Sequence, residues 1–273
     1  MINSSIHIQP AVRWRMLDYR ELWRYRELAS ALMVRDIKVR YRQTMIGLAW
    51  AVLKPVLTMI VFTIVFSHIV KVSSDGYPYP VFLYAALLPW QFFSNALGSA
   101  ANSVLGSSGL ITRVYFPRLI IPVAAVGACV VDMVVSMAVL ITLMLAYRVA
   151  PTSNLLMVPV LLLMVTLAAL GVGILVAALS VAFRDFIHLL PFALQLWLFL
   201  TPVVYSASII PSLWHWLALI NPMTGLTEGF RSAFLGSPFD FVALVVSALC
   251  AIAVFVVGVL VFERVERGFA DVI

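Results

Sequence analysis

The sequence predicts an all-α, polytopic membrane protein with six transmembrane helices. Hydrophobic residues make up 63% of the 273 residues and charged residues only 11%, whereas soluble domains contain about 45–50% and about 25%. The mean hydropathy is +1.06, and the apolar residues gather in runs long enough to cross a membrane. This composition excludes a soluble enzyme, a nucleic-acid-binding module and a disordered chain.

Six apolar runs define the expected membrane helices. A helix of about 20 residues crosses the hydrocarbon core, and the chain must be helical there because lipid offers the backbone no hydrogen bonds. The fifth run is short, and the stretch 207–220 after it is interrupted by Pro211 and His215. We expect that stretch to form a re-entrant gating hairpin before the last helix. The expected spans are residues 48–70, 81–105, 119–147, 155–183, 189–205 and 241–262.

Basic residues are distributed unequally between the two sides of this bundle. Fourteen Lys and Arg fall on the side of both termini, and Lys71, Arg148 and Arg231 fall on the other. Because cytoplasmic loops are enriched in Lys and Arg, both termini are expected in the cytoplasm. The net charge of +6 is concentrated before residue 45, which indicates a membrane surface as the partner and not nucleic acid. The expected parts are a cytoplasmic segment 1–45, a transmembrane domain 46–262 and a cytoplasmic tail 263–273.

The N-terminal segment contains an expected amphipathic helix. Its apolar residues recur at helical spacing and its charged residues occupy the other faces, which favours a helix lying in the headgroup plane over a solvated charged helix. The apolar positions are Leu22, Tyr25, Ala29, Leu32 and Met33.

Motifs for catalysis are missing from the sequence. It contains no G-x-x-x-x-G-K-[ST] phosphate loop, no H-E-x-x-H and no G-x-S-x-G, and its four histidines lack metal-ligand spacing. The sequence therefore predicts no catalytic residue, no metal site and no cofactor bound by this chain. Cys129 and Cys250 lie inside apolar runs and are interpreted as core residues.

Two ionisable residues lie well inside the expected spans, Lys54 and Asp132. Such residues are costly in lipid and suggest function. Lys54 is close enough to the cytoplasmic headgroups to anchor the helix by snorkelling, or to meet a phosphate-bearing substrate. For Asp132 we favour a packing residue hydrogen-bonded to a neighbouring polar group over a proton relay, because a single acid is a poor proton path.

Aromatic residues on the first and fifth spans could line a passage for sugars, because flat rings stack against sugar faces. The alternative is a membrane-interface belt or a lipid-facing surface. The candidate residues are Trp50, Phe62, Phe66, Phe192, Trp197, Phe199 and Tyr205.

Two cytoplasmic connections, 107–118 and 183–188, are candidate docking elements. The first mixes apolar and aromatic side chains with two arginines, and the second is a charged segment between two apolar spans. Short loops of this kind suit a protein partner, and the alternative is a loop whose aromatics rest among lipid headgroups.

These residues together resemble the membrane subunit of ABC-2-type exporters of lipid-linked polysaccharide, which include O-antigen, teichoic-acid and capsule permeases. The pattern Q-T-M-I-G-L-A-W is more similar to the O-antigen and teichoic-acid members than to the capsule members. The matching segments are R-D-I-K-V-R-Y-R-Q-T-M-I-G-L-A-W-A-V-L-K-P at 35–55, L-P-W at 88–90, L-I-T-R-V-Y-F-P-R-L-I-I-P at 110–122, F-R-D-F at 183–186, T-P-V-V-Y at 201–205 and N-P-M-T-G-L-T-E-G-F-R at 221–231.

The resemblance implies a homodimer in the bacterial inner membrane with two separate ATPase subunits, which would bind the ATP and Mg²⁺. It implies that the segment 110–118 is a coupling helix docked on the ATPase, that the first and fifth spans line the channel, and that the region 206–236 forms short gating helices. The expected docking residues are Arg113, Tyr115, Phe116, Pro117, Arg118, Arg184 and Asp185.

An anionic lipid headgroup would have to enter from the cytoplasmic side, where basic residues gather. The candidate entrance residues are Arg35, Lys38, Arg40, Arg42 and Lys54. The competing functional classes are a membrane-embedded transferase acting on polyprenyl-linked sugars, for which acid and base residues are missing, and an ion-coupled transporter, which usually shows inverted repeats.

Overall fold

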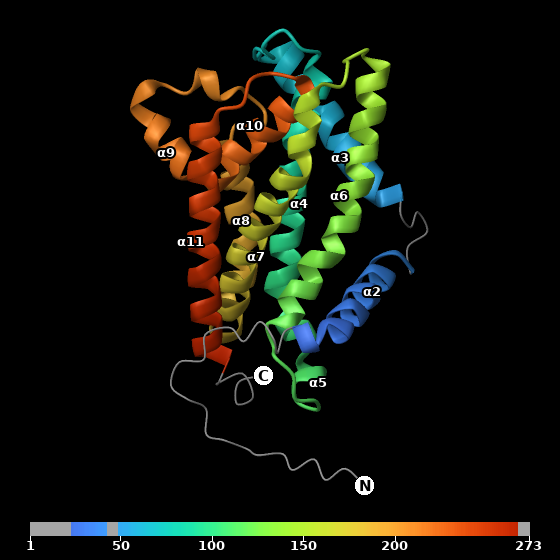
Figure 1. Cartoon of the computed structure of the whole chain (residues 1–273), viewed down its shortest axis with the longest axis vertical. Helices are drawn as coiled ribbons and strands as arrows, with labels where there is room; N and C mark the ends of the chain where they lie inside the picture. The colour runs from blue at the N-terminus through green and yellow to red at the C-terminus, as the bar shows by residue number, and fades with distance from the viewer. Residues whose placement is uncertain (1–22, 43–48, 267–273) are drawn as a thin grey trace.

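The computed structural model describes residues 23–42 and 49–266 (Figure 1). Every regular element in these two segments is a helix, as the sequence predicts. The longer helices are α2 (Arg26–Arg42), α3 (Ala49–Phe62), α4 (Tyr79–Gly106), α6 (Ile120–Ala146), α7 (Val158–Ala182), α8 (Asp185–Leu200), α10 (Pro222–Leu235) and α11 (Phe241–Glu266). The connections contain α5 (Ser108–Ile111), α9 (His215–Ile220) and the short helices η1 (Thr63–Ile69), η2 (Ser153–Met157), η3 (Ala207–Ile209) and η4 (Ser212–Trp214).

The helices form an elongated bundle with two distinct ends (Figure 1). We call them the α5 end, where α5 and the C-terminal end of α11 lie, and the α10 end, where α10 lies. Helix α4 is central and packs most extensively against α6 and α7, and α11 packs along α7. Residues 81–90 of α4 are all buried. The core of the bundle is therefore built around the first half of α4.

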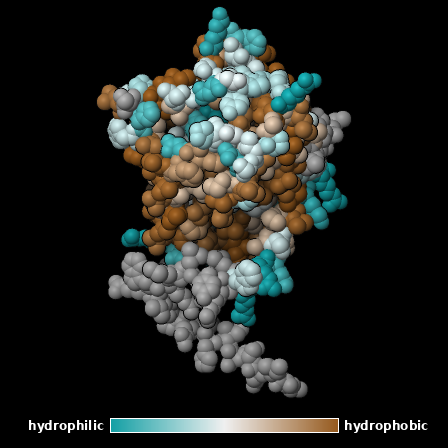
Figure 2. All heavy atoms as spheres, turned by 45° about the horizontal axis from the view of Figure 1, so that its top comes forward, coloured by the Kyte–Doolittle hydropathy of each residue, from teal (hydrophilic) through white to brown (hydrophobic). Residues whose placement is uncertain are grey.

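Four helices of the described residues are long and apolar enough to cross a membrane, namely Ala49–Ile69, Ile120–Ala146, Ser153–Ala182 and Phe241–Glu266. They coincide with the first, third, fourth and sixth expected spans. Helix α4 is 28 residues long but carries Gln, Asn and Ser residues, which lower its hydropathy, and α8 has 16 residues. In Figure 2, hydrophobic residues cover the side of the bundle, and hydrophilic residues gather toward the α10 end. The chain is an integral membrane protein.

Helix α2 packs against α6, so part of the apolar face that was expected among the headgroups lies against the bundle. Leu32 is buried in the bundle, and Tyr25, Ala29 and Met33 pack around the same cluster. A β-carbon added to Gly127 of α6 would lie 2.9 Å from the sulfur of Met33. The expected apolar position Leu22 lies outside the described residues. The face of α2 toward the bundle thus contacts protein and not lipid.

Helices α7 and α11 approach each other through glycine. A β-carbon added to Gly171 of α7 would lie 2.6 Å from the backbone nitrogen of Phe255 on α11. Small residues at such positions allow two membrane helices to pack backbone against backbone. The close contact fixes α11 on the outside of α7.

Helix α10 is almost completely buried at the α10 end, in contact with α4, α7 and α11. The side chain of Asn221 caps its first turn by accepting a hydrogen bond from the backbone nitrogen of Met223 at 3.0 Å. Gly236, at a φ of 80°, ends the helix in the left-handed conformation that favours glycine. The region 206–236, which was expected to form short gating helices, therefore contains a packed helix of 14 residues after the predicted re-entrant stretch 207–220.

Candidate functional site

One face of α4 is polar and partly exposed inside the bundle. We call this face the α4 stripe. Its members repeat every three or four residues, which places them on one side of the helix. They are Gln91, Ser94, Asn95, Gly98, Ser99 and Asn102, whereas the residues between them on the other faces are buried. The stripe is not among the candidate residues predicted from the sequence, although polar residues at helical spacing within an apolar run are a usable signal.

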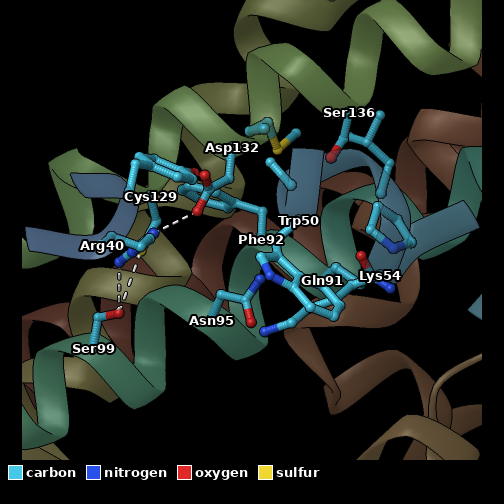
Figure 3. A pocket seen from close by; sticks show the side chains of 15 residues that line it. Arg40, Trp50, Lys54, Gln91, Phe92, Asn95, Ser99, Cys129, Asp132 and Ser136 are labelled. Atoms are coloured by element: carbon cyan, nitrogen blue, oxygen red, sulfur yellow. Dashed lines mark hydrogen bonds and ion pairs between the residues drawn. The ribbon is translucent and has the colours of Figure 1, made fainter. Parts of the chain in front are cut away.

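A cavity of about 530 Å³ lies along the stripe on the side of α3, between α2, α3, α4 and α6 (Figure 3). Its polar lining comes from all four helices, and Pro55 of α3 is also in the wall. The polar and charged lining residues include Arg40, Tyr41, Lys54, Gln91, Asn95, Ser99, Asp132 and Ser136.

Arg40 is the most connected residue of this cavity. Its guanidinium forms an ion pair with Asp132 of α6 and donates hydrogen bonds to the Ser99 hydroxyl at 3.2 Å and to the Cys129 sulfur at 3.4 Å. Burial acts to lower the pKa of Arg40, but Cys129 and Asp132 raise this pKa above the ordinary arginine value. Asp132 is hydrogen-bonded to a neighbouring polar group, as expected, and that partner comes from α2.

Lys54 lies at the opposite side of the cavity from this ion pair (Figure 3). Its ammonium is 6.0 Å from the centre of the Trp50 ring, a distance at which a cation is attracted to the ring face. Within the described residues, no carboxylate forms an ion pair with Lys54. The structure thus brings Arg40 and Lys54 to one cavity, as the entrance hypothesis requires.

The other three candidate entrance residues are placed elsewhere. Arg35, Lys38 and Arg42 line a separate groove of about 800 Å³ on the face of α2 that points away from α6, together with the valines of that face. Arg35 forms an ion pair with Asp36 at 2.8 Å. The five candidate entrance residues therefore do not share one cavity, because the helical repeat of α2 separates Arg40 from the other three.

A second cavity of about 400 Å³ lies along the stripe on the side of α8. It contains the stripe residues Ser94, Gly98 and Asn102, which face Gln195 and Leu198 of α8. The stripe is thus hollowed on both sides, toward α3 and toward α8.

The candidate channel aromatics of α8 and the following turn fall into two groups. Phe192 and Phe199 are exposed, with 59% and 49% of their surfaces accessible. Trp197 packs edge-on against Phe93 with ring centres 5.1 Å apart, and its indole nitrogen donates a hydrogen bond to Asn221 at 3.0 Å. The structure thus leaves Phe192 and Phe199 available for contact and binds Trp197 into the bundle.

The remaining candidate aromatics also differ in whether they are packed or exposed. Phe62 of α3 and Phe66 of η1 pack edge-on with ring centres 5.7 Å apart and are half-buried against the core. The hydroxyl of Tyr205 donates a hydrogen bond to the carbonyl of Phe199 at 3.1 Å. Trp50 is 38% exposed and lines the first cavity.

The connection between α5 and α6 exposes one of its two aromatics. Tyr115 is 87% exposed, whereas Phe116 is 4% exposed and packs in the core with Leu32. The expectation that Phe116 is presented to a partner is wrong, because the chain turns it under the bundle. Arg118 forms an ion pair with Glu266 at the end of α11, and Arg113 is exposed.

The second expected docking segment, at the start of α8, is open to the surroundings. Arg184 and Asp185 are both exposed, and Pro117 of the first segment is half-buried. Both segments lie at the α5 end of the bundle (Figure 1). A partner at that end could contact both.

Arg231 of α10, which sequence analysis counts only as a loop cation, is 2% exposed. Its guanidinium donates to the Glu228 carboxylate at 2.8 Å, to the Tyr205 carbonyl at 2.9 Å and to the Val203 carbonyl at 2.5 Å, and it lies 3.8 Å from the centre of the Phe82 ring. Burial lowers the pKa of Arg231, and Glu228 opposes that shift. Sequence gave no signal for this network, because its members lie on three separate elements.

Potential metal ligands do not gather in the part of the chain that the structure describes, where no group of three or more His, Cys, Asp or Glu residues is placed to hold an ion. The site is therefore a polar cavity system with two cations and one acid.

Comparison with known proteins identifies the family to which this chain belongs. Residues 27–235 match the family described as ABC-2 type transporter. The O-antigen export system permease protein RfbA of Myxococcus xanthus is 31% identical over 255 residues, which cover 92% of this chain and 97% of that protein. A protein of the same name from Klebsiella pneumoniae is 24% identical over 248 residues, covering 90% and 95%. The polysialic acid transport protein KpsM of Escherichia coli is 23% identical over 245 residues, covering 88% and 93%.

Proposed function

Because this chain belongs to the ABC-2 type transporter family, we propose that it is the permease subunit of an ATP-driven exporter of lipid-linked polysaccharide of the O-antigen type. The relatives named as O-antigen export permeases support this substrate class. Capsule polysaccharide is the second candidate, supported by the relative named as a polysialic acid transport protein. Family membership argues against the transferase and the ion-coupled transporter.

The membrane domain of this proposal has six spans. Helix α4, at 28 residues, is about 42 Å long, and α8, at 16 residues, is about 24 Å long. Helix α4 is long enough to cross the bilayer, and α8 would do so together with the turn that follows it. The segment from η3 to α10 then dips into the outer leaflet. The protein would lie in the inner membrane with both termini and the α5 end in the cytoplasm.

ATP hydrolysis is assigned to two separate ATPase subunits that bind ATP and Mg²⁺ beneath a homodimer of this chain. The exposed residues at the α5 end supply the docking surface. Tyr115 is the best candidate anchor, since aromatic residues dominate binding energy at protein interfaces. Arg113, Arg184 and Asp185 would supply charged contacts at its rim.

The α4 stripe carries the proposal for the export path. Polar residues that are partly exposed within a membrane helix need water, protein or a polar ligand as their partner, because lipid provides none. Carboxamide side chains both donate and accept hydrogen bonds, as sugar hydroxyls do. Gly98 and the two serines of the stripe leave room beside those amides. The stripe would form the back wall of the path, with α3 and α8 as its side walls.

The first cavity is the proposed entrance for the phosphate of the lipid anchor. Arg40 and Lys54 face it from two helices, and charge-assisted hydrogen bonds to phosphate are about twice as strong as neutral ones. The amides of Gln91 and Asn95 line the same cavity. A lipid-linked glycan could thus contact cations with its headgroup and amides with its first sugars.

The test replaces stripe amides by leucine, a residue of similar size without hydrogen-bonding groups. Asn95→Leu combined with Asn102→Leu should lower the amount of glycan reaching the cell surface by about tenfold, since each lost hydrogen bond to sugar contributes about 0.5–1.5 kcal/mol. Thr142→Leu is the control, because Thr142 is an exposed hydroxyl on α6 outside the stripe. Normal export by the double variant, at a normal level of permease in the membrane, would reject the stripe as the path.

A further inference from the structure

Asp132 is an unusual neighbour for a cavity proposed to bind an anion. It lies in the middle of α6, and its side chain is 18% exposed. One carboxylate oxygen pairs with Arg40, while the other, Oδ1, is buried without a hydrogen-bond partner in the described structure. An unpaired buried oxygen of a charged group is costly. A residue that served only to fix α2 on α6 would not need a charge with half of its hydrogen bonds missing.

The charges in the cavity are unbalanced. Arg40 and Lys54 contribute two positive charges and Asp132 one negative charge, so the three charged residues that line the cavity carry a net charge of +1. Figure 3 shows Arg40 and Asp132 together at one side, with Lys54, Gln91 and Asn95 farther along the wall. An anion placed between the two cations would therefore compete with Asp132 for the guanidinium.

We propose that Asp132 is a resident counter-ion that occupies Arg40 in the empty cavity and that an incoming phosphate group displaces it. This inference rests on the proposed function, because it describes how the entrance binds its ligand. Phosphate suits the exchange, since guanidinium binds phosphate and carboxylate oxygens with the same forked geometry. A phosphate also contacts Lys54, which Asp132 leaves unpaired, so the second cation favours the incoming group.

The exchange gives the cavity only a moderate affinity for the phosphate. Every phosphate that binds must separate Asp132 from Arg40, and this cost is subtracted from its binding free energy. An anion that reaches only Arg40 gains too little to offset the cost, whereas a phosphate or diphosphate that reaches both cations gains more. Asp132 thus acts as a specificity-determining residue, and it allows the headgroup to leave after transport.

The experiment measures binding of farnesyl diphosphate to the purified full-length permease in detergent by isothermal titration calorimetry. Asp132→Asn should lower the dissociation constant by about tenfold, and Arg40→Gln should raise it by about as much, since hydrogen bonds to charged groups have that size. In the Arg40→Gln background, Asp132→Asn should improve binding by less than it does beside Arg40, because only the repulsion between the carboxylate and the phosphate is then removed. Asp75→Asn, which removes an exposed acid at the α10 end, should change nothing.

The direction in which Asp132→Asn changes the dissociation constant distinguishes a displaced counter-ion from a purely structural ion pair. A purely structural ion pair predicts that Asp132→Asn and Arg40→Gln both weaken binding, and that result, or an unchanged constant for Asp132→Asn, would overturn the proposal. Asp132→Ser repeats the test with a smaller neutral residue if the asparagine variant is not folded, which the midpoint of thermal unfolding reports.

Two further experiments identify the source of the phosphate and test the two proposals independently. Inorganic pyrophosphate that displaces farnesyl diphosphate at comparable concentration assigns the site to the phosphate anion itself, and displacement only by phosphatidic acid in nanodiscs assigns it to a lipid headgroup. Absence of any phosphate binding overturns the inference. Deletion of the permease gene tests the proposed function separately: unchanged glycan export would reject that function, whatever the sign of the Asp132 effect.

Discussion

Arg231 provides the sharpest test of how the α10 end is held together. Its buried guanidinium joins α10 to the turn after α8, through the carbonyls of Val203 and Tyr205, and to Glu228 on its own helix. We predict that Arg231→Met, which keeps the apolar volume but removes the charge and all donors, lowers the free energy of unfolding by about 4 kcal/mol.

This magnitude follows from the bonds that are lost. Hydrogen bonds to charged groups contribute about 1.5–3 kcal/mol each, and removal of one partner from a buried ion pair costs about 3–5 kcal/mol because the other charge is left uncompensated. Glu228 is 25% exposed and can recover part of its hydration, so we take the middle of that range. The double variant Arg231→Met with Glu228→Gln should recover about 1–2 kcal/mol, since it leaves no uncompensated charge.

The assay is denaturant unfolding of the purified full-length chain in detergent, followed by circular dichroism. Arg148→Met is the matched control, because Arg148 is an exposed arginine near the same end of the bundle. Equal unfolding midpoints for Arg231→Met and Arg148→Met would refute the reasoning. A double variant less stable than Arg231→Met alone would refute the part that concerns Glu228.

Two further predictions concern the α5 end and the helix contacts. Phe116→Ala should destabilise the chain by about 3–5 kcal/mol, because it leaves a cavity at a buried position. Tyr115→Ala should leave the unfolding midpoint unchanged and lower the amount of ATPase subunit that co-purifies. Full recovery of the ATPase with Tyr115→Ala would contradict the docking assignment. Gly171→Ala should destabilise the chain by about 1–3 kcal/mol by forcing α7 and α11 apart, as measured by thermal unfolding, whereas Gly106→Ala, where an added β-carbon meets nothing within 4 Å, should not.

Apolar runs were sufficient to predict the long helices, because membrane thickness imposes a length that composition alone reveals. The same reasoning could not predict α10, whose mixed sequence is buried by α4, α7 and α11 and not by its own hydropathy. Nor could it predict that Phe116 is buried and Tyr115 exposed, since the two adjacent residues are both aromatic. Only the turn of the chain between α5 and α6 decides which one enters the core.

The cavity residues show a second limit of sequence reasoning. Lys54 and Asp132 stand out because each is an ionisable residue within an apolar run, and the sequence could therefore identify both as special. Their partners could not be identified in this way, since Arg40 is 92 residues away from Asp132 along the chain. The helical repeat of α2 decides that Arg40, and not Arg35 or Lys38, faces the bundle.

The two polar networks together indicate which helices can move during export. At one position on α4, Ser99 is bonded to Arg40 and through it to α6. Near the start of α4, the Tyr79 hydroxyl donates to the carbonyl of Val204 at 2.7 Å, and Arg231 lies over the Phe82 ring. Helix α4 is thus hydrogen-bonded to its neighbours near its start and at Ser99, and it packs most extensively on α6 and α7. Its contacts with α3 and α8 are fewer and are interrupted by the two cavities. A path along the α4 stripe would thus widen by movement of α3 and α8 against a stationary wall, and a cross-link between α3 and α6 should block export more strongly than one between α4 and α6.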